Sequence, residues 1–146
     1  HDEIGDHIRE KAREYGTTTG RPRRIGWFDA VIGRFSSLVN GYTSVALTRL
    51  DMLDDLSSIK ICTAYTLNGA TLTHLPSSSA DLFNCQPVYE EMPGWLSSTR
   101  DHRNFDDLPG EAQNYVKALE ELIKCSIDLI AVGPRREESI FRRPLP

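Results

Sequence analysis

The chain has 146 residues, of which 39% are hydrophobic and 26% charged, and its formal net charge is -4. These values fit one globular domain with a core and exclude an intrinsically disordered chain. Because binding to nucleic acids or to anionic membranes needs a basic surface, the acidic balance argues against both kinds of partner.

The first half of the chain predicts two helices and a strand. Ile4, Ile8 and Ala12 share one helical face near the start. No methionine precedes this pattern, so we expect a piece of a longer chain. The predicted elements are a helix over residues 1–14, a loop over Thr17–Arg24, a helix from Trp27 to about Val39 and a short buried strand around Ser44–Thr48.

The second half predicts strands around one further helix. Asn68-Gly69 is the preferred pair for a two-residue hairpin turn, and β-rich runs flank it. Alternating strands and helices indicate an α/β sheet with some parallel pairing. In chain order after the hairpin, we expect a long surface excursion over residues 76–106 with an extended "PVYEEMPGW", a helix over Pro109–Lys124, a buried strand "SIDLIAV" and an edge strand "SIFRR".

Several residue types carry no predicted chemistry. The three cysteines, Cys62, Cys85 and Cys125, form no CxxC pair, which favours reduced thiols in a cytoplasmic protein. The four histidines lack metal-ligand spacing, so we assign them no role. We expect the acidic pairs Asp54-Asp55 and Asp106-Asp107 to lie on solvated faces. No apolar run has the length of a membrane-spanning helix.

Threonine, glycine and arginine crowd the stretch "GTTTGRPRR" at residues 16–24. Hydroxyls, backbone amides freed by glycine and guanidinium groups are the donors with which proteins hold carboxylates and phosphates. Pro22 stiffens the backbone between Arg21 and Arg23, which lowers the entropy lost when a ligand is clamped. The residues alone leave two interpretations open: an anion-binding loop or a solvated polar turn.

Two predicted strands end in segments that could hold a purine base. "TRLD" ends at Asp51, whose carboxylate could accept from the N1–H and the exocyclic amine of guanine, while the stem of Arg49 lies along the base. "AVGP" ends the other strand at Gly133-Pro134, and ligands bind outside the carboxyl ends of strands in open α/β sheets. By spacing alone, a helix-capping Asp51 and an ordinary turn remain alternatives.

Five segments follow one another in an order that strongly resembles the adenylosuccinate synthetase family: "YGTTTGRPRRIGWFDAV", "NGYTSVALTRLDMLDDLSSIKICTAY", "PVYEEMPGW", "LPGEAQNYVKALEEL" and "IDLIAVGP". The likeness corresponds to the C-terminal third of that enzyme, so residues 1–146 would be a single partial domain. The resemblance implies the C-terminal part of a P-loop-NTPase-like mixed sheet flanked by helices. It also implies a cytoplasmic, homodimeric ligase that joins IMP and L-aspartate with GTP and Mg²⁺.

The resemblance assigns substrates to individual residues. The loop that closes over aspartate matches Thr17, Thr18, Thr19, Gly20, Arg21, Pro22 and Arg23. In the family, the arginine matching Arg21 also reaches IMP, and the one matching Arg23 reaches GTP. Guanine recognition would fall to Arg49, Leu50 and Asp51, and the same base pocket would be lined by Ala131, Val132 and Gly133.

The sequence departs from the family at two of these positions and lacks part of its machinery. Lysine is usual at Arg49 and serine at Ala131, so only the backbone of Ala131 can contribute. The phosphate loop, the catalytic Asp and His and the Mg²⁺ ligands belong to the N-terminal part. We therefore assign no catalytic or metal-binding residue here and expect the fragment alone to be inactive. The alternative is a non-catalytic truncated nucleotide-binding module or an inactive gene fragment.

Overall fold

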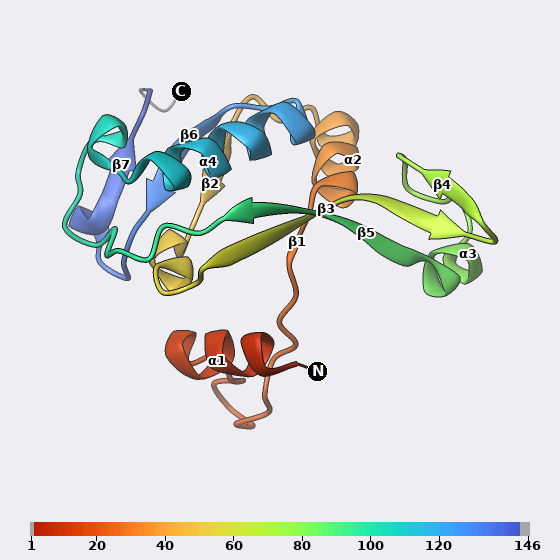
Figure 1. Cartoon of the computed structure of the whole chain (residues 1–146), viewed down its shortest axis with the longest axis horizontal. Helices are drawn as coiled ribbons and strands as arrows, with labels where there is room; N and C mark the ends of the chain where they lie inside the picture. The colour runs from red at the N-terminus through yellow and green to blue at the C-terminus, as the bar shows by residue number, and fades with distance from the viewer. Residues whose placement is uncertain (1, 144–146) are drawn as a thin grey trace.

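The computed structural model describes residues 2–143, which form two sheets with helices packed against them (Figure 1). One sheet contains β1 (Phe28–Asp29), β3 (Ser58–Leu67), β4 (Ala70–Leu72) and β5 (Gln86–Pro93). The other contains β2 (Val45–Leu47), β6 (Ile127–Ala131) and β7 (Ser139–Phe141). The pairs β1–β3 and β2–β6 are parallel, and the remaining pairs are antiparallel. The predicted α/β class with a mixed sheet is confirmed.

The helices follow the apolar periodicity closely. They are α1 (Glu3–Ala12), α2 (Ala30–Asn40), α3 (Ser79–Asn84) and α4 (Gly110–Ile123), with short 3₁₀ turns η1 (Leu50–Leu53), η2 (Phe105–Asp107) and η3 (Arg136–Glu138). The predicted helix over Pro109–Lys124 is confirmed, and its buried stripe consists of Ala112, Tyr115, Val116, Leu119 and Ile123.

Helix α2 begins three residues later than its sequence predicts. Asp29 occupies the N-cap position, where its Oδ1 accepts a hydrogen bond from the Ile32 amide at 3.0 Å. Phe28 and Asp29 instead pair with Ile61 and Cys62 of β3. Strand pairing with β3 therefore places Phe28 and Asp29 outside the helix, although helical periodicity predicts them in its first turn.

The hairpin predicted at Asn68-Gly69 joins β3 and β4. Leu67 pairs with Ala70, and the two turn residues have φ angles of 50° and 83°. Positive φ at both central positions is the requirement of the type I′ turn, which Asn-Gly meets at low cost. The local sequence was sufficient to predict this feature.

The predicted surface excursion is wrong in its central part. The segment Gln86–Pro93 is extended as expected, but it is β5, which pairs with β3 from Ser58↔Pro93 to Thr66↔Gln86. The preceding residues form α3, capped by Ser78, whose Oγ accepts from the Ala80 amide at 3.2 Å. Proline near both ends of β5 suits a strand at a sheet edge, where fewer backbone donors are needed.

One core cluster connects both sheets and α4. It contains Ile59 and Ile61 of β3, Ile127 and Ile130 of β6, and Leu50 of η1. Helix α1 lies on the side of the sheets opposite α2 and α4 (Figure 1). The core thus fixes the carboxyl ends of β2 and β6 beside η1, while residues 17–24, between α1 and β1, are exposed.

Candidate functional site

The carboxyl ends of β2 and β6 meet at one edge of the smaller sheet. The two strands are parallel, and Leu47 pairs with Ile130. A cavity of about 950 Å³ opens there. The residues that line it are Lys11, Ala12, Arg13, Thr48, Arg49, Asp51, Met52, Arg100, Leu129, Ala131, Gly133, Pro134, Arg135, Arg136 and Ser139. Six residues of the segments "TRLD" and "AVGP" are therefore brought together in one cavity: Thr48, Arg49, Asp51, Ala131, Gly133 and Pro134.

Asp51 is the buried carboxylate of this cavity. Its residue is 4% exposed, and its Oδ1 has no hydrogen-bond partner among residues 2–143. Its Oδ2 lies 3.5 Å from Nη2 of Arg100. Burial raises the pKa of the Asp51 carboxyl, and the Arg100 guanidinium opposes that rise. An acceptor left without a donor is costly inside a protein, and such atoms are expected at ligand sites.

The alternative role of Asp51 as a helix cap is wrong. The N-cap of η1 is Arg49, and no side chain caps the first turn. A second buried carboxylate shows that burial alone does not single out Asp51. Asp128 also has an unpartnered Oδ1, with Nε of Arg143 3.8 Å away, but it lies outside the cavity lining.

Arg49 is held in place by the end of α1. Its backbone has a φ of 62°, which is unusual for a residue with a side chain. Its Nη1 donates to the carbonyl oxygen of Ala12 at 2.7 Å and lies 2.9 Å from Oε1 of Glu14. These contacts orient the guanidinium beside the cavity, and about half of the side chain is exposed.

Leu50 and Val132 do not line the cavity with their side chains. They are 1% and 0% exposed and belong to the hydrophobic core. Any contact of these two residues with a ligand would have to come from the backbone. Gly133 lies close to η3, and a Cβ added there would lie 2.5 Å from the carboxylate of the Glu138 side chain, which would have to move aside.

The loop Thr17–Arg23 is exposed and is held by backbone contacts within itself. The Gly16 amide donates to the Arg21 carbonyl and the Gly20 amide to the Gly16 carbonyl, both at 2.8 Å. Gly20 has a φ of 65°, which glycine adopts without strain. The loop lines neither the 950 Å³ cavity nor a smaller one nearby. The structure does not, therefore, bring the loop and the cavity residues into one site.

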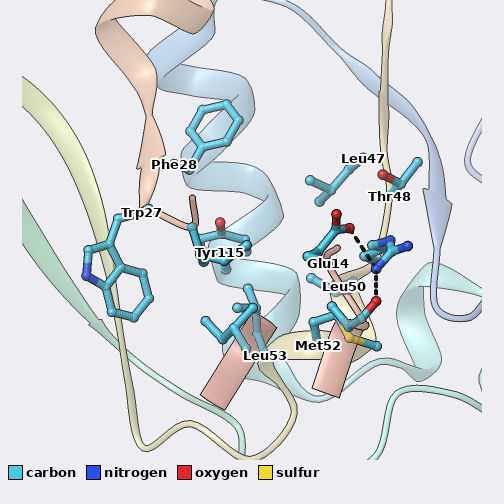
Figure 2. A pocket seen from close by; sticks show the side chains of 14 residues that line it. Glu14, Trp27, Phe28, Leu47, Thr48, Leu50, Met52, Leu53 and Tyr115 are labelled. Carbon is cyan, nitrogen blue, oxygen red and sulfur yellow. Dashed lines mark hydrogen bonds and ion pairs between the residues drawn. The ribbon is translucent and has the colours of Figure 1, made fainter. Parts of the chain in front are cut away.

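Glu14 links the two regions and was missed by sequence reasoning. Its Oε1 lies 2.9 Å from Nη1 of Arg49, and its Oε2 lies 3.3 Å from Nη1 of Arg23. The bridging carboxylate lies at the edge of a second, largely apolar cavity of about 280 Å³. Figure 2 shows Trp27 and Phe28 on one side of this cavity and Leu47 and Thr48 on the other. Nothing in the spacing along the chain indicated this role of Glu14.

Asp54 was expected on a solvated face, and that expectation is wrong. Its Oδ1 accepts from Trp95 Nε1 at 2.8 Å and from Thr99 Oγ1 at 2.9 Å, and its Oδ2 accepts from the Thr99 amide at 2.9 Å. Asp55 is exposed as expected and pairs with Lys11 at 2.8 Å. Asp106 and Asp107 are exposed as well.

The cavity lining is strongly cationic although the chain is acidic overall. Among its described lining residues, six are basic and Asp51 is the one acid; the basic residues are Lys11, Arg13, Arg49, Arg100, Arg135 and Arg136. Clustered cations around a concave surface raise the local concentration of anions. The arrangement suits an anionic ligand that also carries a pair of hydrogen-bond donors for the buried carboxylate.

Residues 2–143 contain neither a clustered set of metal ligands nor a membrane-spanning helix. No group of three or more His, Cys, Asp or Glu residues there could hold a metal ion. In the same part of the chain, no helix is both long and apolar enough to cross a bilayer.

Comparison with known proteins gives matches over nearly the whole chain. The sequence profile of the family described as adenylosuccinate synthetase matches residues 1–140. An adenylosuccinate synthetase from Dehalococcoides mccartyi is 57% identical over 141 residues, which are 97% of this chain and 33% of that protein. One from Caldanaerobacter subterraneus is 54% identical over 142 residues, with the same coverage of 97% and 33%.

A solved structure has the same fold. It is the fully ligated adenylosuccinate synthetase from Plasmodium falciparum, with a TM-score of 0.91 and 35% sequence identity. The match covers 97% of this chain and 34% of that structure. The chain thus spans about a third of the length of the relatives it matches.

Proposed function

Because the chain belongs to the adenylosuccinate synthetase family, we propose that it is the C-terminal third of a GTP-dependent ligase that joins IMP and L-aspartate. In that reaction GTP phosphorylates O6 of IMP, and the aspartate amine then displaces phosphate at C6 to give adenylosuccinate, the precursor of AMP. The C-terminal placement rests on the resemblance of the five ordered segments to that part of the family. The P-loop-like sheet, the cytoplasmic location and the homodimer are part of the same proposal.

One observation supports a guanine site here. Asp51 lines a cavity whose other charged residues are basic, and one oxygen of its buried carboxylate accepts no hydrogen bond from residues 2–143. A carboxylate accepts hydrogen bonds only, so it matches the N1–H and 2-amino group of guanine together. Adenine presents an acceptor at N1 and would be repelled. Arg49 would lie along the base, and the backbone of Ala131–Gly133 would form the opposite wall.

The exposed loop would supply the charge for the other substrates. Arg21 is exposed, and its guanidinium makes no hydrogen bond or ion pair within residues 2–143, so it is available for the aspartate carboxylates and for IMP. The hydroxyls of Thr17, Thr18 and Thr19 would add donors. Arg23 is held by Glu14 at 3.3 Å and would turn to GTP. These groups bind and orient substrates and neutralise developing charge.

No proton transfer or metal ligation is assigned to this chain. Mg²⁺, when bound in the complete enzyme, supplies charge stabilisation for the transferred phosphoryl group, and residues outside the chain would hold it. The catalytic acid and base are likewise proposed to lie outside the chain.

The proposal is tested with Asp51→Asn in a complete synthetase, either the full-length protein or a chimera with the remaining part of the Dehalococcoides mccartyi enzyme. The NH₂ group of the asparagine is a donor, as is the 2-amino group of guanine that it would face. Because two donors cannot bond each other, kcat/KM for GTP should fall by about tenfold or more. XTP, which has a carbonyl oxygen at that position, should be used better than by the parent. Unchanged use of GTP with no gain for XTP would place the guanine site elsewhere.

The alternative is a truncated module that binds nucleotide without catalysis, or an inactive fragment. The isolated chain should form no adenylosuccinate in either case, so activity of the fragment cannot separate them. The coding sequence upstream of His1 can: an open frame encoding a phosphate loop supports the enzyme. A start codon at that point, or a stop codon just before it, supports the truncated module.

A further inference from the structure

Two carboxylates with opposite surroundings lie at η1: Asp51 within the turn and Asp54 directly after it. Asp54 accepts three hydrogen bonds from Trp95 and Thr99, whereas Asp51 has one oxygen without a partner. Thr99 is 0% exposed and Trp95 7%. The segment Trp95–Thr99 is therefore clamped onto η1 at a fixed place, although 41 to 45 residues separate it from Asp54 in the sequence.

Arg100 is the residue directly after the clamped segment Trp95–Thr99. Its side chain is about half exposed and its Nη2 reaches Oδ2 of Asp51, 3.5 Å away. No other side chain of residues 2–143 forms an ion pair with Asp51. Arg100 also lines the 950 Å³ cavity. The clamp thus places one guanidinium at one oxygen of Asp51, on the wall of the candidate guanine site.

We infer that Arg100 is a positioning residue for guanine recognition: it orients Asp51 and keeps its carboxylate an acceptor. This inference rests on the proposed role of Asp51. Each carboxylate oxygen has two lone pairs, so Oδ2 can accept from Arg100 and from a ligand at the same time. Arg100 would act on the nucleotide through Asp51, and the Asp54 clamp would hold Arg100 in register.

The charges around Asp51 predict how it responds to pH. Burial raises the pKa of the Asp51 carboxyl and the neighbouring Asp54 charge raises it as well, whereas Arg100 and Lys11 lower it. Arg49, Arg135 and Arg136 line the same cavity. Removal of Arg100 raises the pKa further, so Asp51 becomes protonated at a higher pH. A protonated carboxyl carries a donor and no longer matches guanine. As the pH is lowered, GTP binding by the variant without Arg100 should therefore begin to weaken at a higher pH than GTP binding by the parent.

The test is Arg100→Met in a complete synthetase, with Arg100→Lys as the conservative variant. Methionine keeps a long stem without the charge. At neutral pH the KM for GTP should rise about three- to tenfold, while the KM values for IMP and aspartate stay unchanged. The rise in KM should grow as the pH falls. The KM for GTP of Arg100→Lys should lie close to that of the parent, because lysine keeps the positive charge. Calorimetric titration with GTP across pH gives the same answer without turnover.

Two further variants, Arg34→Met and Asp51→Asn, show whether an effect is specific to Arg100 and whether the guanine site itself is correct. Arg34→Met removes a positive charge on α2, where the guanidinium bonds the Thr73 carbonyl, and should leave the KM for GTP and its pH profile unchanged. If Arg100→Met also leaves both unchanged while Asp51→Asn impairs GTP use, the positioning role is wrong and the guanine site stands. If Asp51→Asn has no effect either, the proposed guanine site fails and the inference fails with it.

Discussion

The cavity beside η1 and the loop Thr17–Arg23 are built in opposite ways. The cavity residues follow from strands and a turn anchored in the core, and Asp51 is 4% exposed. The loop is held by its own backbone hydrogen bonds, and each of its residues is exposed. A buried carboxylate discriminates between bases because its geometry is fixed, whereas an exposed loop can close over a substrate and release it. Mutations should therefore separate stability from kinetics in the two regions.

The largest effect is expected at the clamp of the cavity region. Asp54→Ala leaves the indole N–H of Trp95 and the amide and hydroxyl of Thr99 without acceptors. We expect the free energy of unfolding to fall by about 3 kcal/mol, because each buried unsatisfied donor costs about 1–3 kcal/mol. Thermal or urea unfolding of the complete synthetase measures it.

Asp55→Ala is the matched control for that substitution. Asp55 is adjacent, is exposed and pairs with Lys11 and His7, so its loss should cost under about 1 kcal/mol. Equal destabilisation by the two variants would contradict the clamp.

The next effect is kinetic and lies in the loop. Arg21→Leu removes the proposed charge-assisted pair with substrate, worth about 1.5–3 kcal/mol, so we expect a loss of about tenfold or more in kcat/KM for aspartate. The melting temperature should barely change, since the side chain is exposed and its guanidinium forms no hydrogen bond or ion pair within residues 2–143. Arg24→Leu, in the same arginine run, is the control. A lower melting temperature with unchanged aspartate kinetics would favour the solvated polar turn.

Glu14→Gln tests whether the two regions are coupled. The neutral amide weakens the ion pairs with Arg23 and Arg49, which lie at 3.3 and 2.9 Å. Exposed pairs contribute under about 1 kcal/mol, so the KM values for aspartate and GTP should each rise about two- to threefold. Steady-state kinetics with each substrate varied in turn measures both. A rise in only one of them would show that Glu14 serves one region alone.

The smallest effect concerns the stability cost of Asp51. Burial raises its folded-state pKa above the unfolded value, so the ionised carboxylate opposes folding at neutral pH and the opposition fades as the pH falls through the folded-state pKa. Asp51→Asn should therefore raise the melting temperature at neutral pH, by roughly 1–2 °C, with a smaller gain in acid. A lower melting temperature at neutral pH would mean that Asp51 stabilises the fold.

Much of the fold was predictable because its signals are local. The stripe of α4 repeats every three to four residues, and Asn68-Gly69 specifies its own turn. The start of α2 and the strand β5 were not predictable in this way. Both depend on pairing with β3, and a pairing partner 20 to 35 residues away leaves no periodic trace in the segment itself.

The sequence by itself determined the chemistry present: a donor-rich loop at Thr17–Arg23 and a carboxylate at the end of a strand. Only the tertiary structure decided which of these groups meet. Asp51 and Asp54 are three positions apart, yet one remains unpartnered in a cavity and the other clamps a distant segment. The physical reason is that burial and long-range hydrogen bonds depend on what packs opposite a residue. Neither Glu14 between two arginines nor Arg100 beside Asp51 could be read from spacing along the chain.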